Sequence, residues 1–186
     1  MKVRKLGEFT VSEIGLGCMS MSFGYGKPNE EESERALLRA LDIGYTFLDT
    51  ASIYGIGHNE KLIGRVLKDR RDEFVLASKC GILVTEDGGR SVDCTPKNVR
   101  KTCEQSLKNL DTDVIDLYYL HQPDVSIDLD ETLSTMNALH EEGKFKEFGL
   151  SNFAGWEVVD IWHRCKEKGW VLPTVYQGMY NGITRD

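Results

Sequence analysis

Short apolar segments alternate with amphipathic helical segments along almost the whole chain, and this alternation limits the possible folds more than any other feature. The apolar segments are rich in β-branched and aromatic residues, and several lack a polar face, which is typical of buried parallel strands. They cover residues 14–19, 46–49, 74–78, 114–120, 145–150 and 174–177. A strand therefore recurs about every 30 residues, which is the length of a βα unit.

The segments between these strands carry helix start and stop signals. Asn29 precedes three glutamates, and Thr95 precedes a proline at the first helical position. Glycine ends three of the helical patterns, at Gly44, Gly143 and Gly169. We also expect a small hairpin over residues 3–11 and a polar loop over residues 81–93 that is long enough to be functional.

Repeated βα units form either an open doubly wound sheet or a closed barrel. The open sheet that binds a dinucleotide usually carries GxGxxG after its first strand. Residues 15–17 and 55–57 both read Gly-X-Gly, but neither pair is followed by the third glycine. The pattern therefore favours an α/β fold of the (β/α)8 TIM-barrel type, as a single domain over residues 1–186.

Charge and cysteine content exclude several classes of protein. The net charge is −7, so we expect no nucleic-acid partner and no attraction to an anionic membrane. No apolar run approaches the ~18 residues of a membrane helix, and no signal-peptide core follows the basic N-terminus, so a cytoplasmic protein is expected. The five cysteines form no CxxC pair, which argues against a disulfide framework and predicts no metal site.

Polar residues occur where the apolar runs end. They are Asp49, Lys79, His121, the pair Ser151 and Asn152, and Gln177, with Tyr54 just beyond the second strand. Each has a plain structural interpretation alone, as a cap, a solvated strand end or a core residue. In a parallel barrel, however, all carboxyl strand ends lie on the face that holds active sites. Together these residues predict a site where neighbouring ionisable groups shift one another's pKa values.

Several motifs resemble the aldo-keto reductase family. They occupy residues 44–55 (GYTFLDTASIYG), 59–64 (NEKLIG), 78–79 (SK), 116–121 (DLYYLH) and 149–153 (GLSNF), together with Gln177. The resemblance extends over about residues 3–182. The segment 143–185 looks most like the branch of aflatoxin-aldehyde and succinic-semialdehyde reductases.

The resemblance implies a barrel that binds NADP(H) without a Rossmann motif and reduces a small aldehyde or ketone to an alcohol. The family tetrad corresponds to Asp49, Tyr54, Lys79 and His121. Tyr54 would be the proton donor, and Lys79 would lower the pKa of Tyr54 toward the working pH. Asp49 would hold Lys79, and His121 would orient the carbonyl oxygen. Three further positions, Ser151, Asn152 and Gln177, would hold the nicotinamide carboxamide.

The length limits this interpretation. Eight βα units need about 250 residues, whereas 186 residues supply about six of the eight. The resemblance assigns the phosphate-binding segments and the aromatic residue that stacks on nicotinamide to the last two units. Three hypotheses follow: an incomplete NADP-dependent reductase, a short non-catalytic member that binds a partner or self-associates through open barrel edges, or a barrel that uses Lys79 for Schiff-base chemistry.

Overall fold

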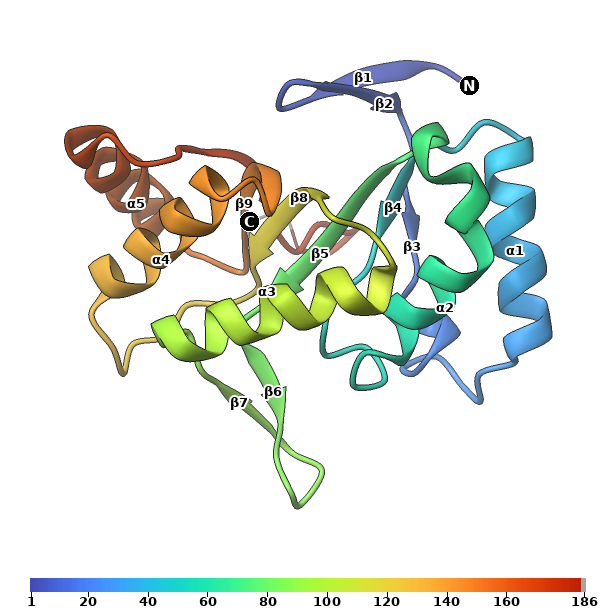
Figure 1. Ribbon diagram of the computed structural model, residues 1–186, viewed down its shortest axis with the longest axis horizontal. Coiled ribbons are helices and arrows are strands. Elements are labelled where there is room, and N and C mark those ends of the chain that lie inside the picture. The colour runs from blue at the N-terminus through green and yellow to red at the C-terminus, as the bar shows by residue number, and fades with distance from the viewer. Residues whose placement is uncertain (185–186) are drawn as a thin grey trace.

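A curled parallel sheet of six strands dominates the computed structural model, which describes residues 1–184 (Figure 1). The strand order across the sheet is β10-β9-β8-β5-β4-β3. Their bounds are Leu16–Gly17 (β3), Phe47–Asp49 (β4), Val75–Cys80 (β5), Ile115–Leu120 (β8), Phe145–Ser151 (β9) and Pro173–Gln177 (β10). Every neighbouring pair is parallel. The predicted incomplete (β/α)8 barrel with about six units is confirmed.

The first strand is shorter than predicted. Residues 14–19 were expected to be extended, but β3 covers only Leu16–Gly17. The chain turns into a 3-10 helix at Met19–Met21, directly after the amide of Cys18 donates to the carbonyl of Asp49. The apolar run therefore predicted too long a strand, because the residues after Gly17 form a turn and the start of the 3-10 helix.

Helices follow the strands and cover the outer face of the sheet. They are Glu30–Asp42 (α1), His58–Leu67 (α2), Pro96–Leu110 (α3), Leu129–Glu141 (α4) and Gly155–Lys168 (α5), with a 3-10 helix at Lys68–Glu73. The side chains of Asn29 and Thr95 cap α1 and α3 as the sequence indicates. Each helix turns an apolar stripe inward, for example Val99, Cys103 and Leu110 on α3, and these stripes build the main core.

Two hairpins lie at opposite ends of the sheet (Figure 1). Val3–Leu6 (β1) and Phe9–Ser12 (β2) form the predicted N-terminal hairpin, which is joined to the amino end of β4 by hydrogen bonds between Ser12 and Thr46. The second hairpin corrects a prediction. The expected loop 81–93 contains antiparallel strands Ile82–Val84 (β6) and Arg90–Val92 (β7), because apolar, β-branched residues flank a glycine-containing tip.

The inner face of the sheet is lined by a smaller cluster of Ala77, Leu117, Tyr119 and Val175. Gly149 on β9 makes room for the Tyr119 ring, since a Cβ at this glycine would lie 2.4 Å from the ring carbons. All five cysteines are buried free thiols. Within residues 1–184, no helix combines the length and the apolar character needed to cross a membrane.

Candidate active site

The predicted polar residues meet at the carboxyl end of the parallel sheet. Asp49 ends β4, Lys79 lies near the end of β5, and His121 directly follows β8. Ser151 and Gln177 end β9 and β10. Because these strands are adjacent and parallel, residues that are far apart in sequence come to one edge, as the strand pattern predicts.

An ion pair between Asp49 and Lys79 forms the base of the site. The Lys79 side chain is 0% exposed, and its ammonium Nζ donates to Asp49 Oδ1 at 2.5 Å and to the carbonyl of Thr50 at 2.8 Å. Asp49 is only 13% exposed. A buried ammonium requires a charged partner and good hydrogen bonds to remain ionised, and the pair supplies both.

The loop between β4 and α2 brings Tyr54 over this pair. Its turn is fixed by the Tyr54 amide donating to the Ala51 carbonyl at 3.0 Å and by the Ser52 hydroxyl donating to the Lys79 carbonyl at 2.9 Å. The Lys79 ammonium lies 5.4 Å from the centre of the Tyr54 ring. The His121 ring meets Tyr54 edge-on, with 6.1 Å between ring centres. The four tetrad candidates therefore form one cluster.

Burial controls the protonation of two of these groups. Burial raises the pKa of Tyr54 above its usual value, and the positive charge of Lys79 offsets only part of this effect. Lys79 lowers the pKa of Tyr54, as expected, but burial outweighs this effect, so the net pKa is not brought down toward the working pH. Burial, helped by the charges of Lys79 and Arg90, lowers the pKa of His121 to about 3. At neutral pH, Tyr54 carries its proton and His121 is uncharged.

Asn59 and Glu60 support the site, although sequence reasoning gave them no role. Asn59 is fully buried; its Oδ1 accepts from the Thr50 hydroxyl at 2.6 Å, and its Nδ2 donates to the Cys18 carbonyl at 2.8 Å. Glu60, also fully buried, accepts from the Ser78 hydroxyl at 2.7 Å. The NEKLIG motif contained the signal, because polar residues at the start of α2 face the strand ends beside Asp49 and Lys79.

Amide side chains line the other half of the site. Asn152 adopts a left-handed conformation with φ 61°, and its Nδ2 donates to the His121 carbonyl at 2.9 Å. Gln177 Nε2 donates to Asp49 Oδ2 at 3.0 Å. Within residues 1–184, the carbonyl oxygens of both amides accept no hydrogen bond. These oxygens are available as acceptors, and the Ser151 hydroxyl as a donor, for a polar ligand.

Phe23 and Arg90 also border the site, and sequence reasoning missed both. The centre of the Phe23 ring lies 5.9 Å from the centre of the Tyr54 ring. The Arg90 guanidinium lies over the same Phe23 ring, 5.3 Å from its centre. They come from the segment after η1 (Met19–Met21) and from β7. No spacing in the sequence joins these segments, since only the folded hairpin brings them together.

Comparisons with known proteins match this chain to one enzyme family. The model of the aldo/keto reductase family matches residues 13–186. Aldo-keto reductase family 7 member A3 from Homo sapiens is 42% identical over 175 residues, which cover 91% of this chain and 50% of that protein. The chain thus spans about half the length of the curated relatives it matches.

Solved structures agree with the sequence comparison. The holo form of aldo-keto reductase AKR11C1 from Bacillus halodurans superposes with a TM-score of 0.82 at 32% identity, covering 97% of this chain and 58% of that one. The glycerol dehydrogenase AKR11B4 from Gluconobacter oxydans superposes with a TM-score of 0.85 at 28% identity, covering 98% and 56%.

Proposed function

The chain belongs to the aldo/keto reductase family, and we propose that its site reduces an aldehyde or ketone to an alcohol with NADPH as the hydride donor. The observation that carries the proposal is the buried Asp49–Lys79 pair beneath Tyr54, with neutral His121 against the tyrosine ring. This arrangement supplies a proton donor, a charge that stabilises the donor after proton loss, and a neutral hydrogen-bonding group in one place.

Tyr54 is the proposed proton donor. Its raised pKa keeps the phenol protonated through the neutral range, so the proton is present when a carbonyl oxygen becomes basic during reduction. As the proton leaves, the phenolate gains the attraction of the Lys79 ammonium, which is shielded from water. Lys79 therefore stabilises the state in which Tyr54 has lost its proton more than the resting state.

The remaining residues position this pair and the substrate. Asp49 pairs with the Lys79 ammonium and holds it in place, and Gln177 donates a hydrogen bond to the second oxygen of Asp49. Because the pKa of His121 lies at about 3, its ring is neutral and can donate one hydrogen bond to a substrate oxygen. Two donors, from Tyr54 and His121, would then fix the carbonyl oxygen.

The amide oxygens of Asn152 and Gln177, which accept no hydrogen bond from residues 1–184, support the cofactor part of the proposal together with the Ser151 hydroxyl. The two oxygens would accept from the carboxamide nitrogen of a nicotinamide, and Ser151 would donate to its oxygen. When bound, reduced nicotinamide supplies a hydride to a carbonyl carbon. The role of the protein residues is to orient that ring beside Tyr54 and His121.

Replacing Tyr54 by Phe tests the proposal. We expect turnover of an aromatic aldehyde, followed as NADPH consumption, to fall about 100-fold or more, because general acid catalysis contributes at least that much. NADPH affinity, measured by fluorescence quenching, should stay within about twofold, since the phenyl ring is kept. Tyr45→Phe, at the amino end of β4, is the matched control. Retention of most turnover in Tyr54→Phe would rule out this donor.

The same measurements separate the alternatives. A wild-type chain that forms a stable, monodisperse oligomer but binds no NADPH would favour the non-catalytic, partner-binding member. Covalent trapping of a carbonyl compound on Lys79 by borohydride would favour Schiff-base chemistry. The proposed reductase predicts NADPH binding and no such adduct, because the Lys79 ammonium is fully buried and held by Asp49.

A further inference from the structure

A further cavity lies on the outer face of the sheet, under the helices and beside the carboxyl end of β8. Its volume is about 200 Å³, and its walls come mostly from the segment 122–129 and the first half of α5. Leu120 and Ile161 line it and belong to the main core beneath the helices, whereas Tyr119 packs on the inner face of the sheet. Neighbouring strand residues point to opposite faces, and the four tetrad candidates do not line this cavity. It is therefore separate from the candidate active site.

Two large apolar side chains at this cavity face water. Trp156, in the first turn of α5, is 73% exposed, and Val125, in the segment before α4, is 94% exposed. Both line the cavity. A tryptophan usually buries most of its ring, and exposed apolar side chains that gather at a hollow are typical of a binding site. The cavity therefore offers an aromatic and aliphatic surface to an apolar group.

The charges that line the cavity all have one sign. The charged lining residues are Asp124, Glu157 and Asp160, and within residues 1–184 no lysine or arginine joins them. Glu157 Oε2 accepts from the Ala154 amide at 2.7 Å, whereas its Oε1 accepts no hydrogen bond from the described residues. Burial raises the pKa of Asp124, but bonds from Ser126 and from the Cys94 amide outweigh it and lower the pKa below its usual value. The cavity therefore carries negative charge at neutral pH.

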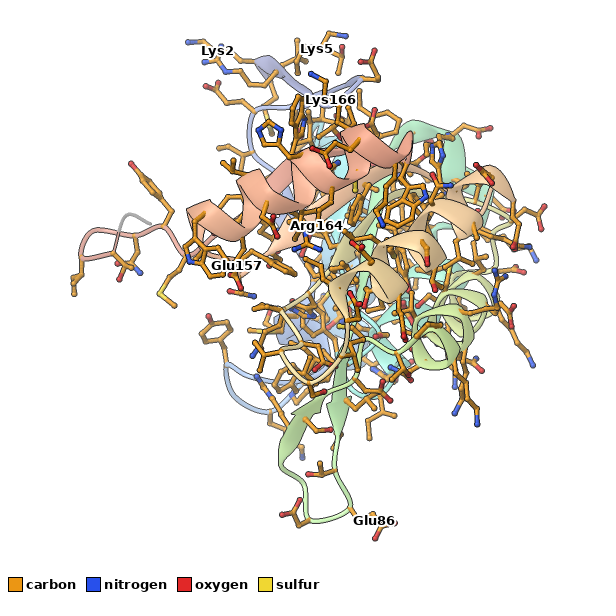
Figure 2. The ribbon with its side chains drawn as sticks, turned by 90° about the vertical axis from the view of Figure 1, so that its left-hand side faces the viewer. Lys2, Lys5, Glu86, Glu157, Arg164 and Lys166 are labelled. Atoms are coloured by element: carbon orange, nitrogen blue, oxygen red, sulfur yellow. The ribbon has the colours of Figure 1, made fainter. Side chains whose placement is uncertain are left out.

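The cations of α5 leave the charge of Glu157 in place. Figure 2 shows Glu157 and Arg164 on the side of α5 that faces α4, and Lys166 on the opposite side. Arg164 donates to Asp160 at 2.8 Å and to Asp130 on α4 at 3.2 Å, so two carboxylates share its single charge. Among the described residues, no cation lies within ion-pair distance of Glu157. A ligand with a positive charge would supply the missing partner.

An ammonium group fits these features better than a neutral or an anionic group. Its charge is attracted both by a carboxylate and by the face of a tryptophan ring. The apolar part of the same ligand would leave water on entering the cavity, which is favourable. We propose that this cavity is a binding site for a small ammonium compound with an apolar body, held by Trp156 and Glu157. The site is independent of the proposed function, because it needs neither NADPH nor the tetrad.

Three probes of similar size test the sign of the charge. They are 2-phenylethylammonium, the neutral 2-phenylethanol and the anionic 3-phenylpropanoate, and calorimetric titration of the full chain near neutral pH measures their Kd values. We expect the ammonium to bind with a Kd of about 1 mM or below, and about 5-fold more tightly than the alcohol. The anion should bind more weakly than the alcohol, because the carboxylates repel it. Added salt should reduce the difference between the ammonium and the alcohol.

Two substitutions separate the charge of the cavity from its ring. Glu157→Gln keeps an oxygen that can accept from the Ala154 amide, so α5 retains its cap. This variant should weaken ammonium binding about 5-fold and leave alcohol binding unchanged. Trp156→Leu should weaken ammonium binding about 3-fold, because an aliphatic side chain has no π face. Glu167→Gln, on the exposed last turn of α5, is the matched control and should leave every Kd at the wild-type value.

Several outcomes would overturn the proposal. Equal affinity for the ammonium and the alcohol would exclude a role for the charge, and no binding of the ammonium at about 10 mM would exclude the site. An equal loss in Glu167→Gln would indicate only a general charge effect. Tyr54→Phe should bind the ammonium as the wild type does, and a loss there would put the ligand in the candidate active site. Because the titrations contain no NADPH, failure of the reductase proposal would leave their result unchanged.

Discussion

Two carboxylates that are largely shielded from water, Asp49 and Asp116, lie at opposite ends of the same parallel sheet. Asp49 ends β4 at the carboxyl edge, and Asp116 lies near the start of β8 at the amino edge. Both bind cations, but the cations differ. Asp116, whose side chain is 4% exposed, accepts from Arg71 at 2.6 Å and from Lys146 at 2.7 Å, and both of these partners reach water. The Lys79 partner of Asp49 does not.

The neighbours of the two carboxylates differ as well. Asp116 also accepts from the amide of Leu76 on β5, so its bonds tie adjacent strands together. Beside Asp49, the His121 ring makes no hydrogen bond within residues 1–184, and Tyr54 has the Lys79 ammonium next to it. The comparison teaches that saturation of the carboxylate and its neighbours distinguishes the two clusters. Both oxygens of Asp116 are bonded, and in the described residues only Arg71 Nε is left unbonded there, whereas the cluster at the carboxyl end keeps the His121 ring open to a ligand.

The largest expected effect comes from Asp49→Asn. The variant leaves the Lys79 ammonium buried without a counter-ion, and we expect a loss of about 3–5 kcal/mol in the free energy of unfolding. Urea unfolding followed by circular dichroism measures it. The double variant Asp49→Asn/Lys79→Met is the control, and it should recover much of the loss because the unpaired charge is gone. If Asp49→Asn lowers the free energy of unfolding only as much as loss of an exposed ion pair does, the two carboxylates do not differ as described.

Asp116→Asn should cost less, about 2 kcal/mol in the same measurement, because Arg71 and Lys146 can turn to water. Burial raises the pKa of Asp116, but bonds from Lys146 and Leu76 and the charge of Arg71 outweigh it and hold the pKa below its usual value. The stabilisation is therefore complete above the ordinary aspartate pKa and is lost as pH falls through the lowered value. Wild type and variant should converge in stability at acid pH.

The convergence of the site residues could be predicted from the sequence, because strand period and parallel order alone place strand ends on one edge. Asp49, Lys79 and His121 each follow an apolar run, and the run identifies the strand. The same reasoning gave the six strands and the N-terminal hairpin. These features depend on local patterns, so one sequence was enough.

Features that depend on long-range packing could not be predicted. The contact of Arg90 with Phe23 needs the β6–β7 pairing, and residues 81–93 read as a loop because their strands are short and partly polar. The lowering of the Tyr54 pKa by Lys79 was predicted, but the net rise was not, because it depends on how deeply the ring is buried. The strand pattern predicts which residues lie near Tyr54, but it does not predict how far the Tyr54 ring is buried.

His121 gives the comparison a pH signature that differs from that of Asp116. Burial, with the charges of Lys79 and Arg90, lowers the pKa of His121 from 6.5 to about 3. Between these values the unfolded chain binds the proton and the folded chain does not, so stability falls as pH falls, by at most about 1.4 kcal/mol per pH unit. His121→Gln should flatten the fall in Tm between about pH 6 and pH 4.5, above the range in which Asp116 titrates. An unchanged slope would show that the ring is protonated in the folded state.

Lys146→Met should have the smallest effect. The Lys146 side chain is 55% exposed, so its bond to Asp116 competes with water, and we expect at most about 1 kcal/mol in unfolding free energy, less in about 1 M salt. Lys61→Met, on an exposed position of α2, is the control for loss of a surface charge. If Lys146→Met costs as much as Asp116→Asn, Lys146 carries the amino-end cluster alone. That cluster would then depend on one cation, as Asp49 depends on Lys79. The two clusters would then differ only in the polar groups of Tyr54 and His121 that stay open to a ligand at the carboxyl end.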